Sequence, residues 1–456
     1  MLRIFRHYIS SRLLLTLLGD ITAILGAAGI VQAQINWTGS GPIWPKAVVL
    51  AMTMTFVLYL ADLYNLPLRF NRSELLIRLL LTSAISAVLF ASIGFMVPQL
   101  RFGRIAYFAV FGWSALGLVV TRMVTLSRGT NQKLRKRILV LGTGVGSEIA
   151  SRDLLNGPIP YTILGFLDDS PDAEDKIPGN YPLLGKSKDL LSVVEDLKPD
   201  VVVVALSDMR GFFPVKEILE CRFRGIRVEE WATFYEKLTS KVYVSGLRPS
   251  WLIFSDGFVK TRLTETIKRA LDVTLAAFGL VVFAPIMTLI AFAIKLDSPG
   301  PVWFRQVRVG RDGRPFVLKK FRSMRINAEE NGPVWATVDD PRVTRVGKWL
   351  RRTRLDELPQ FINVLVGEMS FIGPRPERPV FVNTLREQIP FYGQRFSVKP
   401  GITGWAQVRY RYGSSVEDAL EKLQYDLYYI KNLSVFLDLL ILLNSVQVVL
   451  FRKGAR

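Results

Sequence analysis

The segment PRVTRVGKWLRRTRLDELPQFINVLVGEMSFIGPRPERP, residues 341–379, decides how the C-terminal half of this 456-residue chain is interpreted. Two adjacent carboxylates, Asp356 and Glu357, lie at its centre. An apolar helical pattern starts at Asp356, which predicts that this residue is the N-cap of a helix. The free N–H groups of a helix N-terminus favour phosphate binding. Basic residues flank the pair on both sides: Arg351, Arg352, Arg354, Arg375 and Arg378.

A carboxylate beside a bound phosphate has two chemical uses. It can bind a divalent metal ion, or it can attack phosphorus and become an aspartyl phosphate. An isolated Asp-Glu pair is most often only an N-cap and a favourable first-turn charge. The rigid, basic segment GPRPERP, residues 373–379, argues against that simpler interpretation, because planar guanidinium groups bind phosphate oxygens in pairs.

Four motifs carry a resemblance to a known family: RxxRLDELPQFINVL, GEMSFIGPRPE, KPGITGWAQVR and YDLYYIKN. From about Lys268 to Arg456 the chain resembles the catalytic domain of the bacterial sugar transferases, the large monotopic polyprenyl-phosphate phosphoglycosyl transferases. The start, MLRIFRHYIS, and the segment RPSWLIFSDGF, residues 248–258, resemble the full-length branch associated with exosortase/PEP-CTERM exopolysaccharide loci. The resemblance therefore covers essentially the whole chain.

Composition excludes several function classes. The chain is 50% hydrophobic with a net charge of +20, which fits membrane segments and partners such as anionic lipid and nucleotide phosphates. No basic, aromatic-interleaved nucleic-acid module is present. Because Cys221 is the only cysteine and His7 lies alone as the only histidine, three features are excluded: intrachain disulfides, metal sites built from Cys or His, and Ser-His-Asp or Cys-His catalysis. Catalysis is expected to depend on carboxylates, Lys, Arg and a hard metal ion.

Residues 1–130 are predicted to form a four-helix transmembrane bundle. Four apolar stretches, at about residues 13–35, 44–64, 75–97 and 105–126, are each long enough to span a bilayer. Basic clusters before the first stretch, between the second and third, and after the fourth place both ends in the cytoplasm of a bacterial inner membrane protein. Asp20 and Asp62 lie in or near these stretches, where a functional role and helix pairing are both open.

Residues 131–255 are predicted to form a Rossmann-like accessory domain. A strand at 137–142 leads into the turn GTGVGS and a helix at 148–155, and further parallel strands are expected at GFLDD, 165–169, and VVVVAL, 201–206. Ser147 replaces the third glycine of a dinucleotide motif, and Asp168 comes later than the expected acid. A structural or regulatory domain is favoured over a cofactor site.

Residues 256–456 are predicted to form an α+β catalytic domain with a re-entrant membrane helix at about residues 268–297. A fifth crossing would place the arginine-rich segment outside the cell, against the charge rule. Pro285 bends the helix, so the chain can leave on the side from which it entered. The family's re-entrant helix usually breaks at a Ser-Pro pair, and Ala284 replaces that serine here.

Three polar residues at the start of this helix, Lys268, Arg269 and Asp272, are predicted to lie at the membrane interface. There they are expected either to fix the membrane topology of the helix or to bind a lipid phosphate. The resemblance also implies roles for residues farther along the chain. Asp356 and Glu357 are catalytic and bind Mg²⁺. The predicted phosphate- and nucleotide-binding residues are Lys320, Arg351, Arg375, Arg411 and Asp426, the last also a helper in metal binding.

The resemblance implies transfer of sugar-1-phosphate from a UDP-sugar to undecaprenyl phosphate, with UMP as the second product, to initiate exopolysaccharide synthesis. Asp356 would form a covalent phosphosugar intermediate; single displacement, with Asp356 only a metal ligand, is the alternative. A membrane-bound nucleotide-sensing regulatory or scaffold protein of polysaccharide export is the alternative from another class. A nucleotide-sugar epimerase or dehydratase is excluded, because no Tyr-x-x-x-Lys motif accompanies the glycine turn. Expected partners are the donor, the lipid acceptor, the membrane and a second copy in a homodimer.

Overall fold

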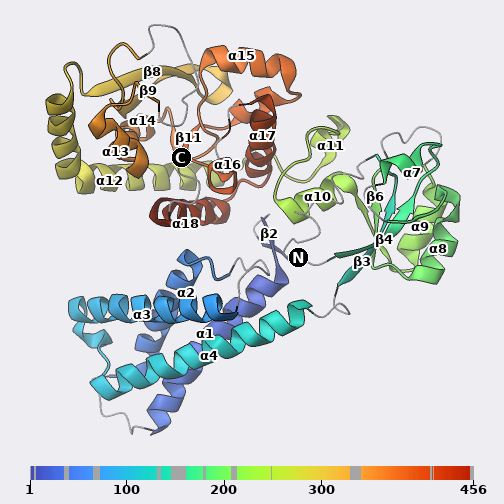
Figure 1. The fold of residues 1–456 in the computed structure, drawn as a ribbon, viewed down its shortest axis with the longest axis horizontal. Helices are drawn as coiled ribbons and strands as arrows, with labels where there is room; N and C mark the ends of the chain where they lie inside the picture. Colours follow the sequence, from blue (N-terminus) through green and yellow to red (C-terminus); the bar gives the residue numbers. More distant parts are fainter. Residues whose placement is uncertain are drawn as a thin grey trace. The chain divides into compact units, whose positions relative to one another are not determined.

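The computed structural model divides the chain into two compact units, which are drawn as a ribbon in Figure 1. The first comprises Met1–Arg3 and Tyr8–Thr239, and the second comprises Ile4–His7 and Ser240–Arg456. Residues 240–255, assigned above to the accessory domain, thus group with the second unit. The described residues are 2–4, 7–34, 41–64, 72–130, 135–144, 161–177, 181–206, 213–247, 249–328, 340–410, 413 and 415–451.

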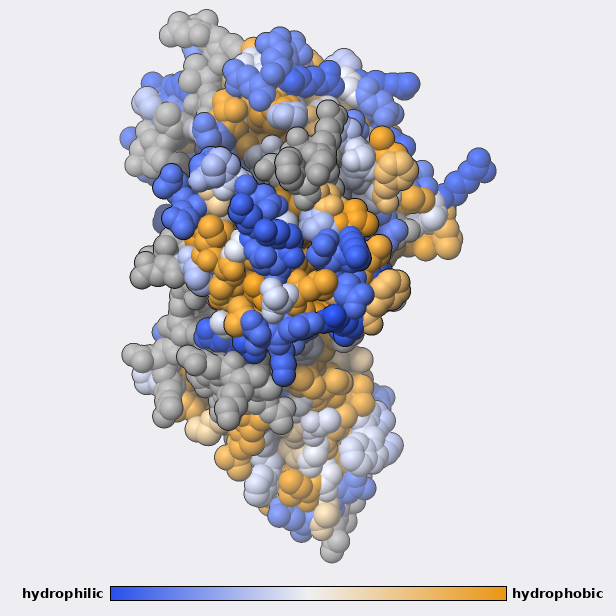
Figure 2. Space-filling model, turned by 90° about the vertical axis from the view of Figure 1, so that its right-hand side faces the viewer, coloured by the Kyte–Doolittle hydropathy of each residue, from blue (hydrophilic) through white to orange (hydrophobic). Residues whose placement is uncertain are grey.

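The first unit contains a bundle of apolar helices, in which α1 packs against α2 and α4, and α3 packs against the same two helices. Their length and hydropathy suit membrane spans, and in the described part of the chain α12 of the second unit shares these properties. Hydrophobic residues spread over the lower part of Figure 2, where the bundle lies. The bundle helices are α1 (Ser11–Gln34), α2 (Ile43–Leu60), α3 (Arg72–Met96) and α4 (Arg104–Thr130).

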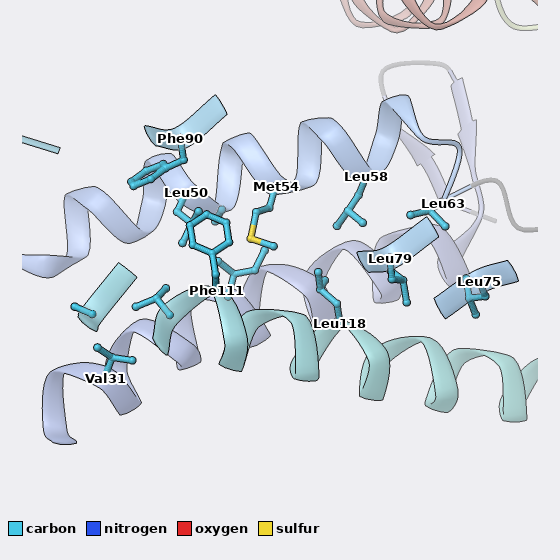
Figure 3. Close-up of a cluster of buried hydrophobic side chains, with 14 residues drawn as sticks. Val31, Leu50, Met54, Leu58, Leu63, Leu75, Leu79, Phe90, Phe111 and Leu118 are labelled. Atoms are coloured by element: carbon cyan, nitrogen blue, oxygen red, sulfur yellow. The ribbon is translucent and has the colours of Figure 1, made fainter. Parts of the chain in front are cut away.

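The interior of the bundle combines an apolar core with one ion pair. Figure 3 shows side chains such as Leu50, Met54 and Phe111 meeting between the helices. Arg122 of α4 donates hydrogen bonds to both carboxylate oxygens of Asp20 in α1, at 2.9 Å each, and both side chains are buried. A bidentate pair of this kind joins two helices strongly in an apolar environment. The structure therefore supports helix pairing as the role of Asp20.

A five-stranded parallel sheet follows the bundle in the first unit, with its strands in the order β5-β4-β3-β6-β7. Its strands are β3 (Lys136–Leu141), β4 (Tyr161–Leu167), β5 (Leu183–Gly185), β6 (Val201–Val204) and β7 (Arg227–Glu230), joined in the described part by helices such as α8 (Leu190–Leu197) and α9 (Val215–Phe223). The four valines of β6 are all buried, as expected for a central parallel strand. The predicted parallel Rossmann-like strands are confirmed, whereas the predicted helix at 148–155 lies outside the described residues.

The second unit is α+β. An antiparallel hairpin pairs β8 with β9, and a short parallel pair joins β10 to β11. Its main elements are α11 (Pro249–Phe254), α12 (Arg262–Asp297), β8 (Trp303–Val309), β9 (Pro315–Phe321), α13 (Arg345–Thr353), η5 (Leu355–Glu357), α14 (Gln360–Val366), β10 (Ser370–Ile372), α15 (Pro379–Gln388), η6 (Tyr392–Ser397), β11 (Gly401–Thr403), α16 (Trp405–Arg409), α17 (Val416–Lys431) and α18 (Val435–Phe451).

The helix α12 packs on the unit on both sides of Pro285. Before the proline, Ala276 packs with α14; after it, Ile290 and Ile294 pack with Phe321 and neighbouring apolar residues. Figure 1 shows the ribbon of α12 changing direction along its length. Large apolar side chains on the other face are exposed: Phe278, Val281, Val282, Leu289, Phe292 and Leu296. This helix therefore presents an apolar face that the rest of the unit leaves uncovered.

Three glycines bring the segments around β10 and β11 into backbone contact. A Cβ atom built on Gly401 would lie 2.1 Å from the Gly373 nitrogen, and one built on Gly404 would lie 2.2 Å from the Gly373 oxygen. No side chain fits at such distances. Glycine at these positions therefore permits the close approach of the two backbone segments.

Replacing Gly401 by Ala is expected to destabilise the unit by about 1–3 kcal/mol, because the strands must separate to admit the methyl group. The matched control is Gly393→Ala, since a Cβ there would meet only Arg386, at 3.9 Å. Thermal unfolding of both variants measures the difference. Equal stability of the two variants would show that the β10–β11 contact can relax freely.

Candidate active site

The two central carboxylates lie on a 3-10 turn, η5, between α13 and α14. Arg354 ends α13 in the left-handed conformation, with φ 58°, and the chain then makes the turn that buries Asp356 and Glu357. The N-cap of α14 is Pro359, so the predicted N-cap role of Asp356 is wrong. The left-handed residue separates the two helices before the carboxylates, and the apolar pattern alone does not reveal it.

Two cations from distant segments reach this turn. Lys320 of β9 donates a hydrogen bond from Nζ to Glu357 Oε1 at 3.0 Å, and the same Nζ lies 4.0 Å from Asp356 Oδ2. Arg375, on the loop after β10, donates from Nη2 to Glu357 Oε1 at 3.0 Å. The structure thus brings four of the predicted site residues together.

The two carboxylates have opposite electrostatic environments. Burial raises the pKa of Asp356, and the negative charge of Glu357 adds to this effect against the pull of Lys320. Burial also opposes ionisation of Glu357, but the charges of Lys320 and Arg375 outweigh it and hold the pKa of Glu357 well below its usual range. Glu357 is therefore the fixed anion of the pair, and Asp356 is the more basic carboxylate.

Asp356 is also the carboxylate with free acceptor capacity. Among the described residues it accepts no hydrogen bond, and its side chain is about 10% exposed. Arg351, in the last turn of α13, contributes positive potential at Asp356. A carboxylate in this position can approach a phosphorus atom or a metal ion while the surrounding cations bind phosphate oxygens.

Asp426 lies behind the site rather than in it. Its buried carboxylate accepts a hydrogen bond from Arg395 Nη2 at 2.9 Å, and that guanidinium also donates to the backbone oxygen of Arg375 at 3.1 Å. Asp426 therefore acts through Arg395 on the loop after β10 that carries Arg375, which we call the arginine loop. The structure does not bring Asp426 to Asp356 or Glu357. Sequence reasoning missed Arg395, because it lies in FYGQRFSVKPG with no local pattern that marks it.

The arginine loop borders two shallow depressions. One, with about 220 Å³ of empty space, is lined by Arg308, Lys320, Gln360 and Arg375 among others, and a second of about 180 Å³ lies beside Arg375 and Arg395. Arg308 of β8 was also missed; its Nη1 donates to the Pro376 oxygen at 2.9 Å. The first depression collects cationic side chains, which suits a substrate that carries phosphate.

The three polar residues at the start of α12 bind the unit itself. Lys268 Nζ donates to the Ile372 oxygen at 3.0 Å and to Asp438 at 2.8 Å. Arg269 donates to the Val364 and Leu365 oxygens, which caps the end of α14. Asp272 accepts from Ser370 Oγ at 3.0 Å and from the Phe371 nitrogen at 2.8 Å. These contacts attach α12 to α14 and β10, and a lipid-phosphate role for the three residues stays a prediction.

At Pro285 the chain supplies a hydroxyl from a different position than a Ser-Pro pair would. Thr288 Oγ1 donates to the Ala284 oxygen at 3.0 Å, one turn back along α12. Such bonds from Thr to the preceding turn accompany helix bending. Thr288 therefore places a hydroxyl group near Pro285, although Ala284 replaces the serine of the Ser-Pro pair.

Mg²⁺ fits the donor types at the site. It commonly takes one or two protein carboxylates and completes its coordination with phosphate oxygens and water. The described residues contain no group of three or more His, Cys, Asp or Glu side chains placed to hold a metal. Asp356 and Glu357 are thus the carboxylates that could bind it, together with substrate. The predicted phosphate-binding Arg411 lies outside the described residues.

In the accessory sheet, Asp168 follows β4 and bonds to the turn after β3. Its carboxylate accepts hydrogen bonds from the Thr143 nitrogen and hydroxyl, at 2.6 and 2.5 Å, and from the Ser170 nitrogen at 2.8 Å. These bonds occupy the oxygens that a ribose would need. The arrangement supports a structural role for Asp168.

The structure combines apolar helices of membrane-spanning length with a buried carboxylate pair among cations that can bind phosphate. These two features together are expected of a membrane enzyme that acts on phosphorylated substrates. The comparisons with known proteins agree. A family described as bacterial sugar transferase matches residues 263–452, and one described as CoA-binding domain matches residues 60–220.

Curated relatives carry related names. The chain is 30% identical to the UDP-glucose:undecaprenyl-phosphate glucose-1-phosphate transferase of Xanthomonas campestris pv. campestris, over 99% of this chain and 96% of the relative. It is 42% identical to the UDP-N-acetylgalactosamine-undecaprenyl-phosphate N-acetylgalactosaminephosphotransferase of Aeromonas hydrophila, over 58% of this chain and 60% of the relative. It is 49% identical to the UDP-glucose:undecaprenyl-phosphate glucose-1-phosphate transferase of Escherichia coli (strain K12), over 40% of each chain.

The chain belongs to the bacterial sugar transferase family. It spans less than two thirds of the Aeromonas and Escherichia relatives, at 60% and 40% of their lengths. Placement in the narrower exosortase-associated branch stays a prediction.

Proposed function

We propose that the protein transfers sugar-1-phosphate from a UDP-sugar to undecaprenyl phosphate, giving undecaprenyl diphosphate sugar and UMP, as the initiating step of exopolysaccharide synthesis. The names of the relatives support the donor and acceptor classes. The observation that carries the proposal is the carboxylate pair on η5: Glu357 holds Lys320 and Arg375, and Asp356 faces the site with free acceptor oxygens.

The proposed chemistry has two displacements at one phosphorus atom. An Asp356 oxygen attacks the sugar-linked phosphorus, an O–P bond forms, and the P–O bond to UMP breaks. An oxygen of the lipid phosphate then attacks the same phosphorus and releases the Asp356 carboxylate. Lys320, Arg351 and Arg375 bind phosphate oxygens, since stabilising this charge is most of the catalytic task in phosphoryl transfer. Asp356 and Glu357 are the residues that would hold Mg²⁺, which when bound would supply further charge neutralisation.

The proposal includes a re-entrant α12 and a catalytic unit that faces the cytoplasm. Both halves of α12 pack on the same unit, as described above, which supports a helix that enters and leaves the bilayer on one side. The basic residues that flank the apolar helices support the cytoplasmic orientation. UDP-sugars are made in the cytoplasm, so this orientation also gives the site its donor.

The test is UMP release from a panel of UDP-sugars by the full-length protein in lipid nanodiscs with Mg²⁺, with and without undecaprenyl phosphate. Lipid-dependent UMP release from one sugar is the expected result and names the donor. Binding of a nucleotide without turnover of any sugar would instead favour a nucleotide-sensing scaffold protein.

Removal of divalent metal by EDTA is expected to abolish UMP release, and added Mg²⁺ is expected to restore it. Glu357→Gln should raise the Mg²⁺ concentration needed for half-maximal rate, because one of two ligand carboxylates is lost. Full activity in EDTA would contradict the assignment of a metal to this pair.

Labelling of single cysteines tests the re-entrant helix. In a Cys221→Ser background, Arg262→Cys and Lys295→Cys place thiols at the exposed ends of α12. A membrane-impermeant maleimide is expected to label both sites from the cytoplasmic side only. Labelling of the two sites from opposite sides would show a crossing.

A further inference from the structure

His7, the only histidine of the chain, is buried in the second unit rather than free in an N-terminal tail. The segment Ile4–His7 groups with the catalytic unit, although more than 230 residues separate it from Ser240, where the rest of that unit begins. The imidazole is only 4% exposed. A buried polar side chain contributed by such a distant segment needs specific partners.

Those partners are aromatic residues of α16 and α17. His7 Nδ1 and the Tyr428 hydroxyl form a hydrogen bond of 2.8 Å. The edge of the imidazole meets Trp405 at a centroid distance of 5.6 Å with the rings nearly perpendicular, and Trp405 stacks on Tyr428. Trp405 and Tyr428 are both fully buried. His7 therefore closes an aromatic cluster at the junction of the two helices.

This cluster continues into the segments that shape the site. The Arg409 guanidinium lies over the Trp405 ring at 4.4 Å, on the helix that follows the β11 glycines. Asp426 precedes Tyr428 by two residues on α17 and holds the Arg375 backbone through Arg395. A change in the position of α16 or α17 would thus reach the loop that carries Arg375 and the segment that follows β11.

We propose that Ile4–His7 is a docking segment that completes the catalytic unit, and that His7 is a positioning residue which fixes Trp405 and Tyr428, and through them α16 and α17. The occupant of this aromatic surface is the chain's own N-terminal segment, which three residues separate from the start of α1 at Ser11. The docking itself does not depend on which reaction the unit catalyses.

Acid should weaken the docking. Burial, and then the nearby charge of Arg409, lower the pKa of His7 to about 4, so the docked imidazole is neutral at physiological pH. Two groups face the imidazole: the charged guanidinium of Arg409 in α16 and the titratable hydroxyl of Tyr428 in α17. Because the undocked histidine takes up a proton near pH 6.5 and the docked one only near pH 4, the docked state loses stability as pH falls between these values.

Hydrogen exchange on the full-length protein in nanodiscs tests the proposal independently of turnover. The variants are His7→Ala and His7→Asn, the second of which keeps a hydrogen-bonding group near the Nδ1 position without titrating. The control is Arg3→Ala, an exposed residue just before the docking segment that groups with the first unit. Amide exchange in residues 405–410 and 425–430 is expected to rise at least tenfold in His7→Ala, to rise less in His7→Asn and to stay unchanged in Arg3→Ala. Lowering the pH from 7 to 5 should raise intrinsic-rate-corrected exchange there in wild type but not in His7→Asn.

Kinetics provide the second measurement. His7→Ala and Tyr428→Phe should each raise the KM for the donor several-fold, and the double variant should be no worse than either alone, because both remove the same contact. Independent, multiplying effects would overturn the positioning role. Unchanged exchange in His7→Ala, or exchange that rises equally in β8 and β9, would overturn the docking segment. If wild type shows no turnover of any donor, the exchange experiment still decides the docking.

Discussion

Asp356→Asn is expected to reduce turnover by about 10⁴-fold or more, since losing the nucleophile of a covalent mechanism costs at least this much in comparable enzymes. The amide has the shape of the carboxylate but neither its charge nor its nucleophilic oxygens. The matched control is Asp312→Asn on the exposed turn after β8. Asp312 has φ 57°, a conformation that Asn adopts readily. UMP release should be lost in the first variant and retained in the second.

A trapping experiment separates the two mechanisms. Wild type incubated with labelled UDP-sugar and Mg²⁺, without lipid, should retain labelled phosphosugar on the protein, and Asp356→Asn should retain none. The label should leave as lipid product when undecaprenyl phosphate is added. Normal turnover with no trapped label would favour single displacement, with Asp356 acting as a metal ligand. Turnover that survives in Asp356→Asn would remove this residue from the chemistry altogether.

The pH profile should carry the signature of Asp356. Its raised pKa means that protonation inactivates the nucleophile at a higher pH than for an ordinary aspartate. The acidic limb of kcat/KM is therefore expected above the usual aspartate range. Glu357, with its lowered pKa, should stay ionised across the same range and contribute no limb.

The second large effect is expected from Arg395→Leu, which leaves the buried Asp426 carboxylate without its cation. Breaking one side of a buried ion pair typically costs about 3–5 kcal/mol. The variant also removes the donor to the Arg375 backbone oxygen, so the arginine loop should lose its position. Urea unfolding in detergent measures the first effect, and the KM for the donor measures the second.

A double variant separates stability from positioning. Arg395→Leu with Asp426→Leu replaces the buried pair by apolar groups, which should recover most of the lost stability. Turnover should stay low, because the Arg375 backbone still lacks its donor. Arg386→Leu, on the exposed side of α15, serves as control for loss of a nearby arginine. Full recovery of turnover in the double variant would show that Arg395 acts on stability alone.

The parts of the site that the sequence predicts are those with local patterns. Asp356, Glu357 and Arg375 belong to one segment, and Lys320 lies beside Lys319 near the end of a strand. Long-range partners such as Arg395 and Arg308 carry no such pattern, because their roles depend on backbone oxygens that only the fold brings near.

Two placements that the sequence does not reveal also have physical causes. The N-cap prediction failed because the left-handed Arg354 inserts a 3-10 turn before α14, and a hydrophobic pattern contains no information on a single backbone dihedral angle. The buried position of His7 has no local sequence signal, because its partners, Tyr428 and Trp405, lie some 400 residues away. Parallel strands and apolar helices were predicted more reliably, since burial repeats regularly along each of them.

The ion pair between Asp20 and Arg122 constrains the order in which the bundle can be made. During synthesis α1 leaves the ribosome about a hundred residues before the helix that carries its counter-charge. Until then, an ionised carboxylate within an apolar helix is costly in hydrocarbon. The first helix should therefore settle into the bilayer late, together with the fourth. Truncating the chain before Arg122 would leave an N-terminal segment that inserts poorly, however apolar it is.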